Sequence, residues 1–429
     1  MANLEEVIGK VQSICGTGME LGLERVRRLL ARLGNPETET RFVHVGGTNG
    51  KGSVTVMIEA VLREAGYRTG SFLSPHLHSY TERYRINGLA IAADELAALL
   101  EGLLPHLKAL AREGSAPTEF EVLTAAAFLY FPRNRVDLAV VEVGLGGRLD
   151  ATNVIIPEVA VITNVSLDHT EILGDTLKKV AWEKAGIVKR DVPVVTGADG
   201  EALEVIAGRC RELASPLVVV GRDVTWFEHR TGDRVPSLAI YGRRQRYENL
   251  RLSLWGRHQR TNAACAVAAL EVLDEKGWVV HEEHVRNGLA ALAWAGRFEV
   301  VPGQPDIVMD GAHNPAGAAA LAEAVASRFP GKKAVVVLGI LDDKAREEMV
   351  RSLAKIAGGV VVTRPPGPRA ARWGDVARVV GDLGLPVAAI EDVNGALDIA
   401  RKLSGPDGLI VVTGSLYLVG RVREILVGA

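Results

Sequence analysis

Short apolar runs alternate with longer amphipathic stretches along the N-terminal part of the chain. The runs at 42–45, 138–143, 159–163 and 192–196 are rich in valine, and the stretches between them place apolar residues at helical spacing. Strands buried on both faces of a parallel sheet form such uninterrupted runs, and helices connect them. The pattern predicts a mainly parallel sheet covered by helices.

A second series of the same kind follows. Apolar runs at 306–309, 334–338, 360–363 and 409–412 each precede a helix-like segment, which predicts a smaller, Rossmann-like α/β domain. We place the boundary near Ala295, which gives domains of residues 1–295 and 296–429. Between the two series, the polar stretch 224–254 carries Tyr, Arg and Thr at alternating positions. This pattern predicts an antiparallel ribbon that joins an edge of the first sheet.

The composition narrows the class of protein. The 429 residues are 48% hydrophobic and 24% charged, which is typical of a soluble globular protein of two or three domains. With 50 basic and 52 acidic residues the net charge is −2, so neither a nucleic-acid surface nor a polybasic membrane anchor is expected. Small molecules are the expected partners, and a monomer is the expected state.

The N-terminus and the cysteines predict the compartment. Residues 1–10 mix acidic and apolar side chains without a signal-peptide core, and no apolar run approaches the length of a membrane span. Cys15, Cys210 and Cys265 are scattered and lack metal-ligand spacing. We therefore expect a cytoplasmic protein with three buried, reduced thiols and no disulfide.

A glycine-rich turn between a strand and a helix carries the first candidate chemistry. The run Gly46-Gly47-Thr48-Asn49-Gly50-Lys51-Gly52-Ser53 follows the strand at 42–45 and precedes a predicted helix at 54–65. Backbone N–H groups, a lysine and a helix N-terminus together favour phosphate binding. The spacing departs from the usual P-loop pattern because Gly52 separates Lys51 from the hydroxyl residue. An ordinary glycine turn with a solvated lysine is the alternative.

Three further polar groups follow predicted strands or helices of the same domain. Glu142 ends the strand at 138–143, where an acid in an open α/β sheet can hold Mg²⁺ against phosphates. Asp168 and His169 follow the strand at 159–163 and form a candidate metal-binding pair. Lys184 lies in a helical segment, where a solvated surface charge is the alternative. An ion pair is the alternative for Glu142, and a structural role is the alternative for His169.

The second domain has one polar cluster at a strand end. Asp310-Gly311-Ala312-His313-Asn314-Pro315 combines turn-forming and chemically active residues with a proline suited to open a helix. A plain Asx turn is the competing interpretation. Arg297, between the two domains in sequence, is a candidate phosphate ligand, although such arginines usually make surface pairs.

These residues form an ordered series that resembles one family. The segments are 47–53, 74–77 (Ser-Pro-His-Leu), 142–153, 167–170, 183–187 and 310–315. Together they resemble the folylpolyglutamate synthases, often bifunctional with dihydrofolate synthase, which form the folate branch of the Mur-type ATP-dependent amide ligases. The resemblance extends from about residue 21 to 415. The Gly-Lys-Gly-Ser form and a phosphate loop within the first fifty or so residues also resemble this branch, since other Mur-type ligases usually carry a preceding domain.

The resemblance implies roles for individual residues. For ATP it implies contacts from Asn49, Gly50, Lys51, Gly52, Ser53, Asn262, Arg297 and Asp310. For Mg²⁺, expected as two ions, it implies the ligands Ser53, Ser74, Glu142, His169 and a carbamylated Lys184, whose charge CO₂ addition inverts. For the pterin-bearing substrate it implies Leu21, Gly22, Leu23, Thr118, Glu119, Phe120, Glu121, Leu149, Asp150 and Ala151. Catalytic roles are implied for Lys51, Lys184, Arg297 and His313.

The implied reaction is the ATP-dependent ligation of L-glutamate to the carboxylate of folate, and also of dihydropteroate, through an acyl phosphate. A carboxylate is a poor electrophile, and phosphorylation supplies a leaving group. Two alternatives remain open at this stage: a Mur-type ligase with a different carboxylate acceptor, and a P-loop nucleotide switch without ligase chemistry.

Overall fold

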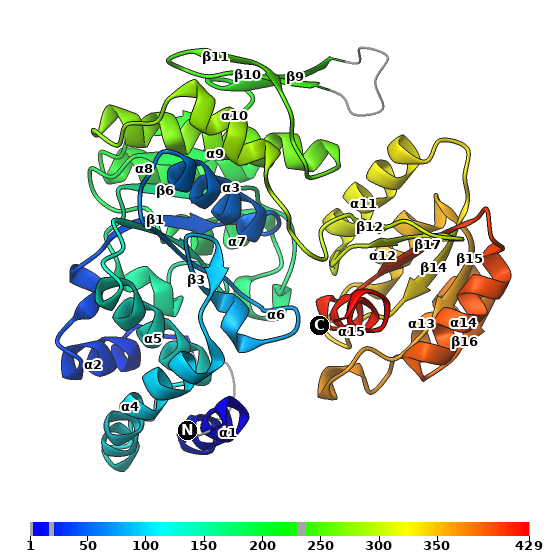
Figure 1. Cartoon of the computed structure of the whole chain (residues 1–429), viewed down its shortest axis with the longest axis horizontal. Helices are drawn as coiled ribbons and strands as arrows, with labels where there is room; N and C mark the ends of the chain where they lie inside the picture. Colours follow the sequence, from blue (N-terminus) through cyan, green and yellow to red (C-terminus); the bar gives the residue numbers. More distant parts are fainter. Residues whose placement is uncertain (1–2, 17–20, 230–236, 429) are drawn as a thin grey trace. The chain divides into compact units, whose positions relative to one another are not determined.

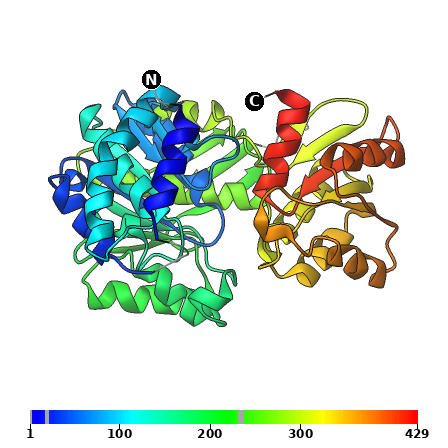
Figure 2. The same ribbon diagram turned by 90° about the horizontal axis from the view of Figure 1, so that it is seen from below.

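The computed structural model describes residues 3–16, 21–229 and 237–428. The chain divides into two compact units. Unit 1 comprises Met1–Leu252 and Thr261–Leu292, and unit 2 comprises Ser253–Arg260 and Ala293–Ala429. In Figures 1 and 2 unit 1 is drawn mainly in blue to green and unit 2 mainly in yellow to red. The boundary is therefore not a single point in the sequence, because the short segment 253–260 belongs to unit 2 and the chain then returns to unit 1.

Unit 1 is built on an eight-stranded sheet in the order β4-β3-β2-β5-β1-β6-β7-β8. Its strands are β1 (Arg41–Gly46), β2 (Thr69–Phe72), β3 (Tyr84–Ile86), β4 (Leu89–Ala90), β5 (Leu138–Glu142), β6 (Val159–Ile162), β7 (Val194–Thr196) and β8 (Leu217–Val219). All pairs are parallel except those that β3 and β4 make at one edge. The predicted mainly parallel sheet is confirmed.

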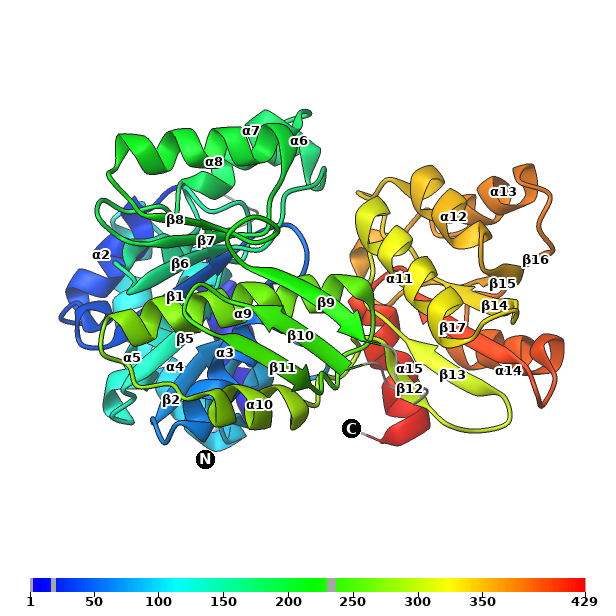
Figure 3. The same cartoon turned by 90° about the horizontal axis from the view of Figure 1, so that it is seen from above.

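Helices cover this sheet. They are α1 (Leu4–Ile14), α2 (Glu24–Arg32), α3 (Lys51–Glu64), α4 (Ala93–Arg112), α5 (Glu119–Arg133), α6 (Thr170–Leu173), α7 (Leu177–Ala185), α8 (Gly200–Glu212), α9 (Arg257–Glu275) and α10 (Glu282–Ala290), with 3₁₀ turns η1 (Pro36–Thr38), η2 (Tyr80–Arg83) and η3 (Ala151–Val154). Apolar residues of α1, α2, α4 and α5 share one core with Phe42 and Phe72 of the sheet. Helices α7 and α8 pack with Ala160 and Ile162 of β6, and Figure 3 shows these two helices along the same side of β6, β7 and β8.

The ends of the central strands β5, β1 and β6 lie side by side. Val45 pairs with Glu142 and with Val161, so the residues that follow these strands begin at the same edge. Helix α3 begins at Lys51, three residues before the predicted start, because Gly50 in the left-handed conformation (φ 81°) already serves as its N-cap. Lys51, Gly52 and Ser53 therefore form the first helical turn, where N–H groups have no intrahelical acceptor.

One prediction about the fold is wrong. Strands β9 (Thr225–His229), β10 (Ser237–Tyr241) and β11 (Arg246–Leu250) do form an antiparallel ribbon, but within the described residues they make their own three-stranded sheet and do not join the eight-stranded one. Buried Glu271 of α9 anchors this small sheet by accepting hydrogen bonds from the backbone N–H groups of Arg243 and Arg244. The anchor is a helix side chain, which strand patterns do not reveal.

Unit 2 has a six-stranded sheet in the order β12-β13-β17-β14-β15-β16. The strands are β12 (Glu299–Val301), β13 (Asp306–Met309), β14 (Ala334–Leu338), β15 (Ala357–Val362), β16 (Val387–Ala389) and β17 (Leu409–Thr413). The helices are α11 (Pro315–Arg328), α12 (Arg346–Ala354), α13 (Asp375–Asp382), α14 (Val393–Ser404) and α15 (Leu416–Val427), with the 3₁₀ turn η4 (Pro368–Ala370). Figure 3 shows α11, α12 and α13 on one face of the sheet and α14 and α15 on the other. The second α/β unit is confirmed.

The structure also tests the expectations of free, buried thiols and of no membrane-spanning segment. Cys15, Cys210 and Cys265 are free, as predicted, but Cys15 is only partly buried. None of the helices in the described part of the chain combines the length and the apolarity that crossing a bilayer requires.

Candidate functional site

The glycine-rich turn after β1 has a backbone that only glycine fits at two positions. Gly47 has φ 135°, and a Cβ there would lie 1.9 Å from Thr163 Oγ1. Gly50 has φ 81°, and its Cβ would lie 2.4 Å from Asn262 Oδ1. L-residues rarely adopt such angles. The turn therefore packs closely against the residue after β6 and against Asn262, one of the implied ATP contacts.

Neighbouring polar groups hold this turn in place. Asn49 N–H donates to Asn164 Oδ1 (3.0 Å), and Asn164 Nδ2 donates back to Asn49 O (2.8 Å). Thr48 Oγ1 donates to Ser166 O and accepts from Ser166 N–H. Lys51 Nζ bonds Thr48 O at 3.2 Å. All of these bonds are made within the protein, so the loop is preorganised, as a phosphate site requires.

Glu142 and Ser74 lie together at the ends of β5 and β2. The Glu142 side chain is buried, and its Oε2 accepts a hydrogen bond from Ser74 N–H at 2.9 Å. Register pairing sets Glu142 beside Val45, the residue directly before the glycine-rich run. Two of the implied magnesium ligands are thus adjacent to the phosphate loop.

Lys184 of α7 is a buried amine beside the same turn. Only 3% of its surface is exposed, and Nζ donates to Gly47 O at 2.9 Å. Burial, aided by the positive charge of Lys51, lowers the pKa of Lys184 to about 7, while Asp168 and Asp150 act in the opposite direction. The lysine is therefore much more often neutral, and so more nucleophilic, than a surface lysine. The alternative of a solvated surface charge is wrong.

Asp168 and His169 lie in the segment that follows β6. Ser166 of this segment is hydrogen-bonded to Thr48 of the glycine turn. His169 has φ 49° and caps α6, and its N–H donates to Asp168 Oδ1 at 2.9 Å. No group of three or more His, Cys, Asp or Glu side chains suited to a metal ion occurs within residues 3–16, 21–229 and 237–428. The implied ligand set relies instead on serine hydroxyls, one carboxylate, one imidazole and a modified lysine. The hydroxyls, the carboxylate and the carbamate of the modified lysine supply the hard oxygen donors that suit Mg²⁺, and the imidazole adds one nitrogen donor.

The implied pterin residues meet at the start of α5 and at η3. Phe120 lies against Gly144, where a Cβ would be 2.4 Å from the ring, and its centroid is 6.1 Å from that of Phe72. A Cβ at Gly144 would also lie 3.1 Å from Asp150 Oδ2. The structure therefore brings Phe120 and Asp150 together, although 30 positions or so separate them in sequence.

Three of the implied pterin residues are engaged in the fold itself. Thr118 and Glu121 form the capping box of α5, and buried Glu121 is paired with Arg25 (3.1 Å). Glu119 accepts a hydrogen bond from Tyr80 OH at 2.6 Å. The Glu121–Arg25 pair brings the start of α2, which follows Leu21, Gly22 and Leu23, to the start of α5. Leu149 and Ala151 flank Asp150.

Sequence reasoning missed a buried chain of polar groups behind Asp150. His44 Nε2 lies 2.9 Å from Thr152 Oγ1, which donates to Asp150 Oδ1 at 2.5 Å. Because a hydroxyl has one proton, His44 must donate from Nε2 when Asp150 is ionised. Burial, and then the charge of Lys189, lower the pKa of His44 to about 3, so the ring is neutral. The only feature of the sequence that indicates this chain of polar groups is the presence of His44 within an otherwise apolar strand.

Burial raises the pKa of the Asp150 carboxyl, and hydrogen bonds from Thr152 and from the amides of Leu145 and Gly144 act in the opposite direction. This carboxylate therefore has a fixed orientation beside Phe120. A fixed polar group beside an aromatic ring is suited to bind a flat heterocycle.

In unit 2 the polar cluster gathers around Gly311, after β13. Asp310 accepts hydrogen bonds from the N–H groups of Phe298 and Ala312, both at 2.9 Å. A Cβ at Gly311 would lie 2.6 Å from Arg297 Nη1, and His313 Nδ1 lies 2.9 Å from Gly311 O, to which it must donate. Arg297, Asp310 and His313 are thus neighbours. Sequence reasoning did not identify His258, which is partly buried near this cluster. Burial lowers the pKa of His258, the charge of Asp310 raises it, and the charges of Arg260 and Arg297 lower it further.

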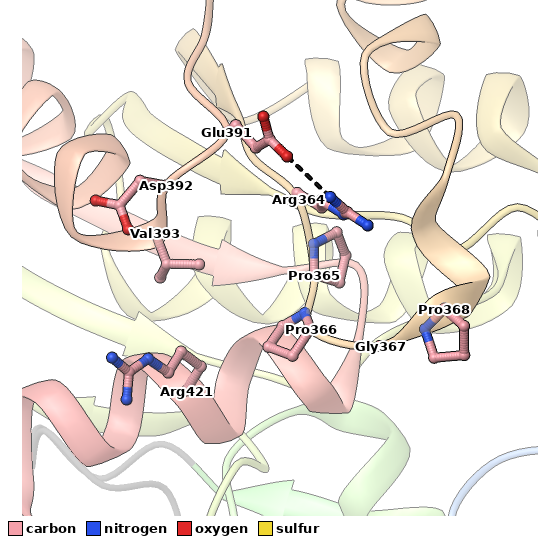
Figure 4. A pocket seen from close by; sticks show the side chains of 9 residues that line it. All are labelled: Arg364, Pro365, Pro366, Gly367, Pro368, Glu391, Asp392, Val393 and Arg421. Atoms are coloured by element: carbon pink, nitrogen blue, oxygen red, sulfur yellow. Dashed lines mark hydrogen bonds and ion pairs between the residues drawn. The ribbon is translucent and has the colours of Figure 1, made fainter.

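Unit 2 also has a cavity of about 460 Å³ that none of the implied residues lines. It lies after the ends of β15 and β16, with Arg364 and Glu391 paired at 2.9 Å along one side and Arg421 of α15 on another (Figure 4). Pro365, Pro366 and Pro368 form a rigid part of its wall. Because no predicted site residue lines this cavity, the sequence analysis gives it no role.

Comparisons with known proteins identify the family. Residues 45–270 match the Mur ligase middle domain, and residues 296–416 match the Mur ligase glutamate ligase domain. The dihydrofolate synthase/folylpolyglutamate synthase of Bacillus subtilis is 38% identical over 95% of this chain and 96% of its own length. That of Mycobacterium tuberculosis is 35% identical over 95% of this chain and 91% of its own length.

Solved structures agree with the sequence relatives. The Mycobacterium tuberculosis folylpolyglutamate synthase complexed with ADP superposes with a TM-score of 0.93 at 33% identity, over 99% of this chain and 98% of that one. Escherichia coli FolC in complex with DHPP and ADP gives a TM-score of 0.89 at 31% identity, over 99% of this chain and 97% of that one. The resemblance seen in the ordered motifs is confirmed, and the chain belongs to the folylpolyglutamate synthase/dihydrofolate synthase family of Mur ligases.

Proposed function

We infer that this protein is an ATP-dependent ligase that joins L-glutamate to the carboxylate of folate. Relatives with that name match it over nearly their whole length, and related structures hold ADP. The observation that carries the proposal in this chain is buried Lys184, whose Nζ contacts the glycine turn at Gly47. Neither an ordinary glycine turn nor a simple nucleotide switch explains a buried, neutral-prone amine at that point.

ATP binding rests on the glycine turn and the start of α3. The N–H groups of Gly50 to Ser53 and the Lys51 ammonium are suited to the phosphates. Asn49 is proposed beside them, with its own N–H bonded to Asn164. Asn262 lies against Gly50. Arg297 and Asp310 are proposed as further nucleotide contacts from unit 2. We keep residues 1–295 as the ATP- and folate-binding domain and 296–429 as the glutamate-ligation domain.

Lys184 is proposed to become a carbamate. A neutral amine attacks CO₂, a C–N bond forms and one proton is released, so a group that was cationic becomes anionic. The pKa of about 7 makes the neutral amine available near physiological pH. The carbamate, with Ser53, Ser74, Glu142 and His169, would hold Mg²⁺, expected as two ions, which neutralises phosphate charge when bound.

The reaction requires positioning more than side-chain nucleophiles. The substrate carboxylate attacks the γ-phosphorus of ATP, and ADP leaves. The amine of L-glutamate then attacks the acyl carbon, phosphate leaves, and the amine loses a proton. Lys51 and Arg297 stabilise the transferring phosphoryl group by charge. His313, which donates to Gly311 O through Nδ1, is proposed to orient the incoming groups.

The pterin is proposed to lie against Phe120 with Asp150 beside it. Dihydropteroate is proposed as a second acceptor, because the E. coli structure holds DHPP and several relatives carry both names. We propose that the protein acts on these small molecules as a monomer, without nucleic acid or membrane partners.

The decisive experiment measures phosphate release from purified protein with Mg-ATP and L-glutamate, in the presence of dihydropteroate, tetrahydrofolate or no pterin, and determines product masses. Release coupled to a mass gain of one glutamate supports the ligase and shows which acceptors it uses. ATP hydrolysis that ignores both glutamate and pterin would refute the proposal and favour a nucleotide switch. Amino-acid-dependent phosphate release that occurs only with another carboxylate, such as a cell-wall precursor, would favour a Mur-type ligase with a different acceptor.

A further inference from the structure

The 74–83 loop, from Ser74 to Arg83, ends in an arginine without a carboxylate partner. Arg83 Nε donates to His76 Nδ1 at 2.9 Å, and its guanidinium carbon lies 5.3 Å from the centre of the Tyr80 ring. Among the residues that the structure describes, no Asp or Glu oxygen lies within ion-pair distance of it. The Nη groups of a half-buried guanidinium are therefore available to an anion.

Hydrogen bonds within the loop hold Arg83 in place. Glu82 accepts hydrogen bonds from the N–H groups of Leu77, His78 and Ser79 at 2.8–2.9 Å, and it closes a capping box with Ser79. Leu73 N–H bonds Arg83 O at 3.0 Å, which aligns the two ends of the loop. A preorganised cation loses little entropy when it binds a carboxylate.

Contacts on both sides of Arg83 lead to the proposed folate residues. On one side, the Leu73–Arg83 bond sets Ser74 next to Arg83, and Ser74 N–H bonds Glu142. On the other side, Tyr80, over which Arg83 lies, donates to Glu119. Tyr84 of the adjoining β3 donates its hydroxyl to Leu123 O of α5, the helix that Glu119 begins, at 3.0 Å. Contacts of Arg83 and its neighbours therefore lead both to the proposed metal ligands and to the proposed pterin contacts, between which a bound substrate would place its carboxylate end.

The two proposed acceptors differ at that end. Dihydropteroate ends in a single carboxylate, which is the group that becomes activated. Folate ends in a glutamate with two carboxylates, so one remains as a free anion while the other reacts. A planar guanidinium matches a carboxylate in a bidentate geometry that a lysine cannot reproduce.

We propose that Arg83 binds the unreacted carboxylate of the terminal glutamate of folate and so favours folate over dihydropteroate as acceptor. The assignment rests on the proposed ligase function. It makes Arg83 a specificity residue for polyglutamate extension, dispensable for glutamate addition to a pteroate.

The test compares two ligands that differ only in the terminal glutamate, tetrahydrofolate and tetrahydropteroate. For Arg83→Gln we expect the Kd and KM of tetrahydrofolate to rise about 10- to 100-fold, the loss of a charged hydrogen-bonded pair, with little change in kcat. Tetrahydropteroate binding and the dihydropteroate reaction should stay at the wild-type level. Arg83→Lys should fall between, because the charge remains and the fork is lost. Arg41→Gln, which removes the same charge from an exposed pair with Glu158, is the matched control and should change neither ligand.

The outcomes separate this assignment from the proposed function. An equal loss of affinity for tetrahydrofolate and tetrahydropteroate would overturn the assignment of Arg83 and indicate that this residue only supports the loop. An unchanged affinity for tetrahydrofolate would also overturn the assignment. Thermal melting of each variant shows whether it folds, and Arg83→Lys keeps the test valid if Arg83→Gln does not. A wild-type protein that binds neither pterin and releases no ADP with them would refute the ligase function itself, and the assignment with it.

Discussion

Alanine at Gly50 should weaken ATP binding, whereas alanine at Gly66, which carries the same backbone penalty, should not. Gly50 is the N-cap of α3 with φ 81°, and Gly66 lies just beyond the other end of the same helix with φ 89°. Each alanine must adopt a left-handed conformation, at a cost of roughly 1–2 kcal/mol. A Cβ at Gly66 meets no atom within 4 Å, whereas a Cβ at Gly50 would lie 2.4 Å from Asn262 Oδ1 and 2.8 Å from its Nδ2. The two substitutions thus share the backbone penalty and differ only at Asn262.

The consequence for function follows from that difference. In Gly50→Ala the buried Asn262 amide must move away, so the nucleotide loses one hydrogen-bonding partner and meets a widened loop. The loss of one such bond, about 1–1.5 kcal/mol, corresponds to roughly 5- to 10-fold weaker ATP binding. Gly66→Ala should bind ATP as the wild type does.

Calorimetric titration with a non-hydrolysable ATP analogue, beside thermal melting of both variants, measures the two effects separately. We expect similar shifts in melting temperature and different affinities. Equal affinities in Gly50→Ala and Gly66→Ala would refute the assignment of this turn and of Asn262 to the nucleotide.

Three other predictions follow from the site. Lys51→Ala should lower turnover by about 100-fold or more without unfolding the protein, as the loss of a transition-state charge partner does, and normal ATP-dependent ligation in this variant would contradict the phosphate loop. Lys184→Ala should be inactive and partly rescued by added short carboxylates that replace the carbamate; full activity without any response to them would exclude the carbamate. His44, with a pKa of about 3 in the folded state against 6.5 in the unfolded chain, is protonated only in the unfolded state between these values. Stability should therefore fall as pH drops from 6.5 towards 3, by about 1.4 kcal/mol per pH unit from this group, and urea midpoints of His44→Leu should show a weaker acid dependence.

Several elements of the fold were predictable because their signals are local. Runs such as 138–143 are apolar throughout since both faces of a central parallel strand are covered. The start of the second α/β series was visible for the same reason. The ribbon at 224–254 was recognised as antiparallel, yet its separation from the large sheet depends on Glu271, a residue of α9 that accepts its backbone N–H groups.

The candidate site was predictable only in part. Asn49 to Ser53 are consecutive, so their chemistry is visible in the sequence, and the ordered motifs named the family. That Lys184 is buried rather than solvated follows from its contact with Gly47, 137 positions away. Thr118 and Glu121, expected at the substrate, are engaged in a capping box, and Glu121 pairs with Arg25.

By itself, the sequence determined the strand and helix order, the glycine turn and the family, because periodicity and motif spacing act over neighbouring residues. Tertiary structure decided which polar groups are neutral, which are paired and which remain available. His44 is neutral because the sheet buries it beside Thr152, and Arg83 is available because the folded loop gives it His76 and Tyr80 instead of a carboxylate. Such properties depend on desolvation and on contacts between distant segments, and only the folded chain creates them.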